Sequence, residues 1–117
     1  MILTSYFANK SIWDAGLRLV AVSLSVPRGF YCERYPALAP SRALINLAHE
    51  GRFDEYTRLY VEQVLSRLDP LKVYRELDGS ILLCWEKAGK FCHRRLIADW
   101  LAKDTGYDVK EFGHDTD

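Results

Sequence analysis

The residues best suited to chemistry lie close together in the second half of the chain, at Cys84, Cys92 and His93. A thiolate is a strong nucleophile and an imidazole transfers protons near neutral pH, so these residue types suit covalent or acid–base catalysis. We therefore predict these three as catalytic residues. Glu86 and Arg94 add a carboxylate and a guanidinium, which forms paired hydrogen bonds to an oxyanion, and we predict that both bind a ligand.

The segment that follows the second of these cysteines is expected to begin a helix. Free N–H groups and the positive end of the helix dipole stabilise a thiolate or hold an anion there. Arg94 and Arg95 in the first turn oppose that dipole unless an anion or an acidic partner offsets them. An interpretation without function is equally open: Arg94 pairs with a neighbour such as Glu86, Arg95 is solvated, His93 makes a local hydrogen bond, and the cysteines are small core residues.

A zinc site is a second possibility for the thiols, because Cys32, Cys84, Cys92 and His93 together form a Cys3His set. The sequence contains no Cys-x-x-Cys pair, and neighbouring Cys92 and His93 would point apart on a helix. We therefore predict no metal and no other cofactor. The Cys-x5-Arg loop of cysteine phosphatases is not indicated either, because Lys90 stands where the arginine would be. A redox-sensitive pair formed by Cys84 and Cys92 stays open.

Further candidate ligand contacts come from two other segments. The irregular run 26–40 carries side chains able to stack on a planar base and pair with a phosphate, among them Arg28 and Tyr31, with Arg34 and Tyr35 beside them. Ser5 and Tyr6 end the first predicted strand and are expected to complete a polar pocket. The alternative is that the aromatic residues beside prolines only pack a long loop onto the domain.

Hydrophobic patterns predict the elements that must position these residues. Strands are expected at 2–7, 17–24, 80–85 and 107–112, from runs of β-branched and other apolar residues. Helices are expected at 42–49, 53–68, 70–77 and 92–103, from apolar residues spaced three and four apart, with one further turn possible within 9–16. Ser41 and Asp69 are expected at the starts of the first and third of these helices, and Gly106 at the end of the last. This order predicts an α/β fold with a mainly parallel sheet of about four strands and helices packed on it. Ligands of such sheets bind at the carboxyl ends of the strands.

The composition is that of one ordinary folded domain, expected to span residues 1–117: 49% of residues are hydrophobic and 27% are charged. Lysine plus arginine equals aspartate plus glutamate at 16 each, so tight binding to duplex nucleic acid is not expected. Met1–Phe7 lacks the basic start of a signal peptide, and no apolar run is long enough to span a bilayer. We therefore expect a cytoplasmic protein with no membrane partner.

The sequence also resembles a known family. Leu82–Glu86, followed by Phe91–Arg94 and an amphipathic helix, is similar to family 488 of the domains of unknown function, in its shorter branch. The similarity extends over most of the chain, to 4–9, 38–40 and 56–70.

By this resemblance, the family's polar signature falls on Cys84, Glu86, Cys92, His93 and Arg94. The family also has a basic residue near the end of the second strand, where this chain places Arg28 after a proline. The resemblance implies an α/β fold and specifies no reaction.

These observations lead to three hypotheses. The first is a small enzyme, or enzyme-derived domain, that binds a phosphate-bearing ligand such as a nucleotide or nucleic-acid end at the carboxyl edge of its sheet. The second is a non-catalytic module that captures a nucleotide signal or a protein partner. The third is a redox-sensitive cysteine pair.

Overall fold

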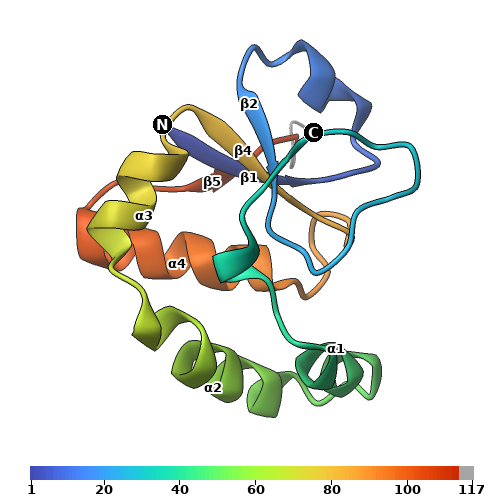
Figure 1. Cartoon of the computed structure of the whole chain (residues 1–117), viewed down its shortest axis with the longest axis vertical. Coiled ribbons are helices and arrows are strands. Elements are labelled where there is room, and N and C mark those ends of the chain that lie inside the picture. The colour runs from blue at the N-terminus through green and yellow to red at the C-terminus, as the bar shows by residue number, and fades with distance from the viewer. Residues whose placement is uncertain (114–117) are drawn as a thin grey trace.

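The computed structural model describes residues 1–113, which form an α/β fold built on a parallel sheet. The strands are β1 (Ile2–Tyr6), β2 (Arg18–Ala21), β3 (Glu33–Arg34), β4 (Ser80–Cys84) and β5 (Lys110–Glu111). They are ordered β3-β2-β4-β1-β5, and every neighbouring pair is parallel (Figure 1). The sheet therefore has five strands instead of the four expected, because β3 was too short to predict within the irregular run.

The central strand β4 is buried along its whole length, since it pairs with β1 on one side and β2 on the other. Side chains alternate between the faces of a strand. Ile81 and Leu83 accordingly pack with Phe7 on one face, whereas Leu82 joins the larger hydrophobic core on the other. Cys84 is two residues after Leu82, so its side chain points to the same face of the sheet, which the α-helices cover.

The α-helices lie on one side of the sheet, and the short 3-10 helix η1 (Lys10–Asp14) lies on the opposite side (Figure 1). In the described residues they are α1 (Arg42–His49), α2 (Phe53–Gln63), α3 (Pro70–Leu77) and α4 (His93–Thr105). Two further 3-10 turns are η2 (Pro36–Leu38), between β3 and α1, and η3 (Leu65–Arg67), between α2 and α3. Their apolar sides form one core cluster with Leu82 of β4.

The helix boundaries follow from capping residues. Ser41 and Asp69 each accept a backbone N–H bond at the start of α1 and α3. Gly106 ends α4 in the left-handed conformation, at φ 81°, as the sequence predicts. The helix predicted to continue to residue 68 instead ends at Gln63, and η3 completes it as a tighter turn.

All strands run in the same direction, so their carboxyl ends meet at one edge of the sheet. The loops after β2 and β4 and the start of α4 gather there. Among residues 1–113, no helix combines the length and apolar character needed to span a bilayer.

Candidate functional site

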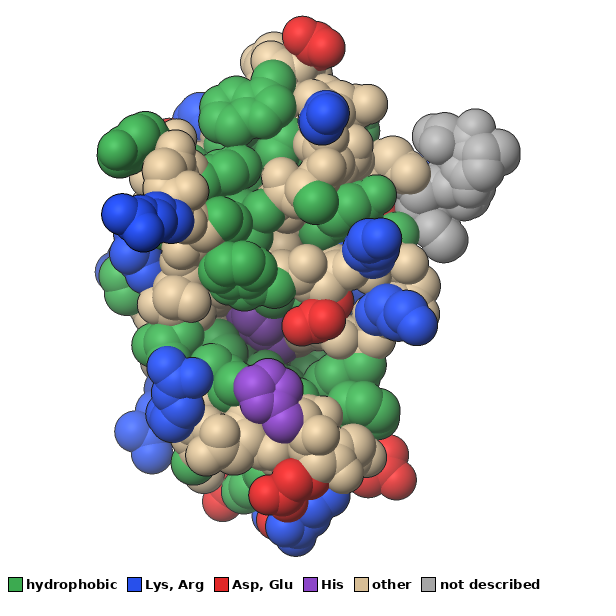
Figure 2. All heavy atoms as spheres, turned by 90° about the vertical axis from the view of Figure 1, so that its right-hand side faces the viewer, with side chains coloured by type: hydrophobic (Ala, Val, Ile, Leu, Met, Phe, Trp, Pro, Cys, Tyr) green, Lys and Arg blue, Asp and Glu red, His purple; other side chains and the backbone are tan. Residues whose placement is uncertain are grey.

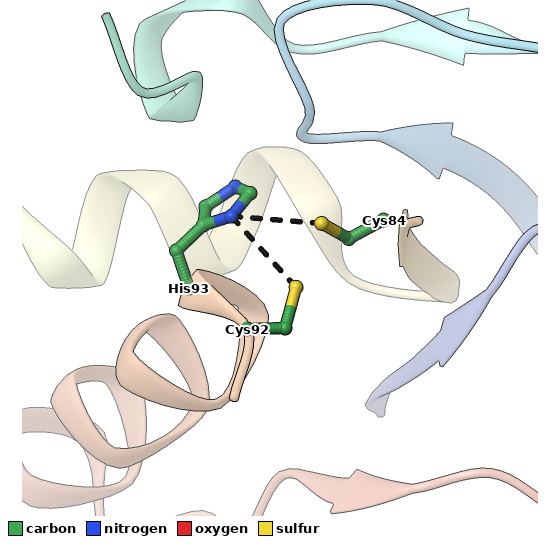
Figure 3. Close-up of side chains that lie close together, drawn as sticks. All are labelled: Cys84, Cys92 and His93. Carbon is green, nitrogen blue, oxygen red and sulfur yellow. Dashed lines mark hydrogen bonds between the residues drawn. The ribbon is translucent and has the colours of Figure 1, made fainter. Parts of the chain in front are cut away.

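The loop between β4 and α4 brings Cys84, Cys92 and His93 together at the carboxyl edge (Figure 3). The His93 Nδ1 atom lies 3.6 Å from Cys84 Sγ and 3.9 Å from Cys92 Sγ. All three side chains are buried. We call this group the thiol cluster.

The backbone of Cys92 explains how two neighbouring residues reach the same point. Cys92 is the N-cap of α4, with φ −155° and ψ 142°, so it lies outside the helix that begins at His93. The angle between the side chains of Cys92 and His93 is therefore not the angle between neighbouring residues within a helix. The sequence-based argument that Cys92 and His93 point apart is therefore wrong, because it placed both residues inside the helix.

A backbone carbonyl fixes the orientation of the His93 ring. The Nε2 atom lies 2.7 Å from the carbonyl oxygen of Val22, which follows β2 and can only accept a hydrogen bond. Nε2 must therefore carry a hydrogen and donate it. Nδ1 faces both sulfur atoms: in the neutral ring it accepts from a thiol, and in the protonated ring it donates to a thiolate.

The surroundings of the two thiols shift their pKa values in opposite directions. Burial opposes ionisation of Cys92, but hydrogen bonds with Cys84 and His93 and the nearby Arg94 hold its pKa well below the usual range. The hydrogen bond with Cys92, together with burial, raises the pKa of the Cys84 thiol well above its usual range. Cys84 accordingly stays protonated and stabilises its partner's negative charge.

The thiol cluster lines a small cavity, the thiol cavity, with a volume of about 80 Å³. Ser23, Tyr56 and Glu86 also line it. Figure 2 shows this face of the molecule hollowed near its centre, with histidine atoms recessed below hydrophobic side chains and an acidic side chain close by. Glu86 is an exposed residue of the cavity lining, and its predicted ligand contact stays a prediction.

Arg94 lies apart from this cavity, in a buried ion pair with Glu111 of β5. Its Nε and Nη2 atoms donate to the two carboxylate oxygens at 3.1 and 2.8 Å. The acidic partner is therefore Glu111 and not Glu86. Arg94 also lines an open groove with Lys90. Its predicted ligand contact stays a prediction, since two sides of the guanidinium are already occupied.

Arg95 is half-buried and donates from Nη1 to Thr4 Oγ1 at 2.9 Å and to the Val109 carbonyl at 3.0 Å. The expectation that Arg95 is solvated is wrong, because the first turn of α4 packs across β1 and the segment leading into β5.

Comparison with known proteins identifies the family. A family model described as the active DUF488-N3 subclade matches residues 6–105. The chain belongs to this family. No curated protein and no solved structure matches it. The matched range includes the whole thiol cluster and Glu86, so the resemblance to DUF488 found in the sequence is confirmed.

A larger cavity adjoins the thiol cavity in this DUF488 chain. It has a volume of about 640 Å³ and shares Ser23 and Pro40 with the thiol cavity. Its polar lining includes Arg34, Ser41, Gln63 and Arg67, and we call it the arginine cavity. The sequence predicts Arg34 among the side chains able to pair with a phosphate, but it does not indicate Gln63 or Arg67. Both lie off the apolar stripe of the predicted helix, where residues are usually solvated, so nothing in the sequence marked them as cavity residues.

The other predicted contacts lie elsewhere. Arg28 and Tyr31 are exposed, Tyr31 to 87%, and neither is among the residues of 1–113 that line the two cavities or the Lys90 groove. Ser5 donates to the Phe112 carbonyl at 3.1 Å and accepts from Asn9 at 3.0 Å, so it fixes the chain after β5. The Tyr6 ring lies 5.9 Å from the Arg94 guanidinium. Tyr6 is also the partner of Cys84 in the pairing of β1 with β4. The ligand contacts of these four residues stay predictions.

Proposed function

We propose that the protein is an enzyme that binds a phosphate-bearing ligand, such as a nucleotide or nucleic-acid end, at the carboxyl edge of its sheet. The reaction takes place at the thiol cluster. The observation that carries this proposal is that Ser23 and Pro40 line both cavities, which therefore lie next to each other. One molecule can therefore contact the arginine cavity and the thiol cluster at the same time.

The sizes of the cavities divide the ligand into two parts. About 640 Å³ is within the range of about 300–1,000 Å³ found for small-molecule sites. The thiol cavity, at about 80 Å³, has room only for a group a few times the size of a water molecule. The body of the ligand thus fits the arginine cavity, and a small reacting group enters the thiol cavity.

The charges of the arginine cavity suit a phosphate. Arg34 uses one guanidinium nitrogen to donate to the Leu24 carbonyl at 2.8 Å, which orients the group and leaves its other donors for a ligand. Arg67 supplies a second guanidinium. Ser41 brings the start of α1, where backbone N–H groups and the helix dipole favour an anion.

The thiol cluster supplies the reactive groups. Burial opposes ionisation of Cys92, but Cys84, His93 and Arg94 lower its pKa and so favour the thiolate, which is the nucleophilic form. His93 Nδ1 is positioned to exchange a proton with either sulfur. The description of the matching family model as an active subclade agrees with an enzyme.

A thermal-stability screen of nucleotides and sugar phosphates tests the proposal. A ligand at about 100 times its Kd should stabilise the protein by about 2.7 kcal/mol. Arg34→Ala and Arg67→Ala should each weaken that ligand's binding by roughly tenfold to 100-fold, because each removes a charged hydrogen bond. Arg58→Ala is the matched control, since Arg58 is an exposed residue of α2 whose partner is Glu62.

Cys92→Ser separates the enzyme from the non-catalytic binding module. An enzyme should keep ligand binding in this variant and lose turnover of the bound ligand. If Cys92→Ser binds the ligand as the wild type does, and the wild type does not turn the ligand over, the non-catalytic binding module is favoured instead. Stabilisation by no phosphate-bearing compound, or equal loss in the Arg58→Ala control, would contradict the phosphate site.

A further inference from the structure

We propose that Cys84 Sγ, Cys92 Sγ and His93 Nδ1 bind one zinc ion and leave its fourth position open to the thiol cavity. The three atoms all lie within 4.8 Å of one another. Two thiolates and an imidazole form a soft donor set that suits zinc better than magnesium or calcium. This inference goes beyond the proposed function, because the metal needs no phosphate-bearing ligand to bind.

The distances match a tetrahedral zinc site. Zinc bonds of about 2.3 Å to sulfur and about 2.0–2.1 Å to nitrogen, at the tetrahedral angle, place the two ligand atoms about 3.6 Å apart. The measured separations of His93 Nδ1 from Cys84 Sγ and Cys92 Sγ are 3.6 and 3.9 Å. The two nitrogen–sulfur separations therefore need to change by only a few tenths of an ångström to hold an ion.

The surroundings of His93 are those of a metal ligand. A histidine that binds a metal through one ring nitrogen usually donates the other ring N–H to a carbonyl or carboxylate. The Nε2–H of His93 donates to the Val22 carbonyl at 2.7 Å, which directs the lone pair of Nδ1 toward the two sulfur atoms. The tautomer and ring orientation that zinc needs are thus set by the backbone after β2.

The open position makes this a site of the catalytic kind. Structural zinc has four protein ligands, whereas catalytic zinc keeps one position for water or substrate. Here that position faces a cavity of about 80 Å³ whose rim carries Glu86. A zinc-bound water would lose a proton to Glu86, and its oxygen would bond to the electrophilic atom of the group in the thiol cavity as the bond from that atom to the leaving group breaks. Glu86 would return the proton to the leaving group. With zinc bound, Cys92 and His93 would be ligands, so the zinc-bound water would replace the Cys92 thiolate as the attacking group. This hydrolytic role rests on the proposed function, but the metal site does not.

Metal uptake by the whole protein tests the site. We expect protein stripped with a chelator and titrated with zinc to bind one ion per chain. Cobalt in place of zinc should give the intense visible bands of a tetrahedral ion and the ultraviolet charge-transfer band of thiolate ligands. Cys84→Ser, Cys92→Ser and His93→Ala should each weaken zinc binding by more than about 100-fold, a larger effect than loss of an outer-shell partner.

Cys32→Ser is the control, because Cys32 is the remaining thiol and lies outside the cluster. It should bind zinc as the wild type does. If a cluster variant fails to fold, the cobalt spectrum of the wild type still decides, since it reports thiolate ligands directly. No metal uptake, an octahedral spectrum without thiolate bands, or equal loss in Cys32→Ser would overturn the site. Arg34→Ala should keep zinc, so failure of the phosphate site is distinguishable from failure of the metal site.

Discussion

At the scale of single residues, the position of Cys92 at the N-cap of α4 determines the chemistry of its neighbours. One residue further along, inside the helix, its thiol would project from another face of α4. At the N-cap it shares His93 Nδ1 with Cys84, and this contact lowers its pKa. The residue types at this site were predictable from the sequence. That the three side chains meet at one point was not predictable, because the direction of the Cys92 side chain depends on whether Cys92 is the N-cap or the first residue of the helix.

The shifted pKa values predict how stability depends on pH in the metal-free protein. Between the lowered pKa of folded Cys92 and the ordinary thiol pKa of about 8.5, the unfolded chain binds one more proton than the folded chain. Stability should therefore rise with pH in this window, by at most about 1.4 kcal/mol per pH unit. Above it, the raised pKa of Cys84 reverses the sign, and stability should fall.

Urea unfolding over this pH range, with chelator present, measures the effect. Cys92→Ser should lose the rising limb, whereas Cys32→Ser should keep it because Cys32 lies outside the cluster. A wild type and Cys92→Ser with parallel profiles would show that Cys92 is not ionised in the folded protein.

At the scale of elements, α4 is held to β5 by the Arg94–Glu111 ion pair. Thr4 Oγ1 also donates to Glu111 Oε1 at 2.6 Å, so one carboxylate joins α4, β1 and β5. Within the described residues, the remaining nitrogen of this guanidinium, Nη1, is buried without a hydrogen-bond partner. Removing the Glu111 carboxylate would leave the buried charge of Arg94 without a partner.

Glu111→Ala should therefore cost about 3–5 kcal/mol in the free energy of unfolding. The matched control is Glu62→Ala, whose pair with Arg58 is exposed and should contribute at most about 1 kcal/mol. Replacing both partners, as Arg94→Met with Glu111→Leu, should recover much of the loss because no charge stays buried. Chemical denaturation measures all three, and a Glu111→Ala cost near that of the control would refute a structural role for the pair.

The sequence predicted elements well where a local signal marks them. Ser41 and Asp69 as N-caps and Gly106 as a C-cap lie where the structure has them, because capping depends on neighbouring residues alone. The strand Glu33–Arg34 was missed because it has two exposed residues and no hydrophobic alternation. Only its pairing with β2 makes it a strand, and that pairing is a property of the tertiary fold.

At the scale of the whole molecule, the parallel sheet gathers residues distant in sequence at one edge. The carboxyl edge was predictable as the location of the site from the order of elements. The arginine cavity was not predictable, because the pairing of β3 with β2 determines the position of Arg34 and the packing of η3 determines the position of Arg67. Phe30 packs on the η1 side of the sheet, and its loop neighbours Arg28 and Tyr31 stay exposed.

Mapping a bound nucleotide onto the protein tests the central claim most directly. Titration of a nucleoside monophosphate into isotope-labelled protein should shift the amide NMR signals of Ser23, Arg34, Leu44 and His93. These residues line the two adjacent cavities. Saturable shifts there, lost in Arg67→Ala, are the result that the account predicts. No shifts, or shifts confined to Arg28–Tyr31, would contradict a phosphate-bearing ligand that reaches the thiol cluster.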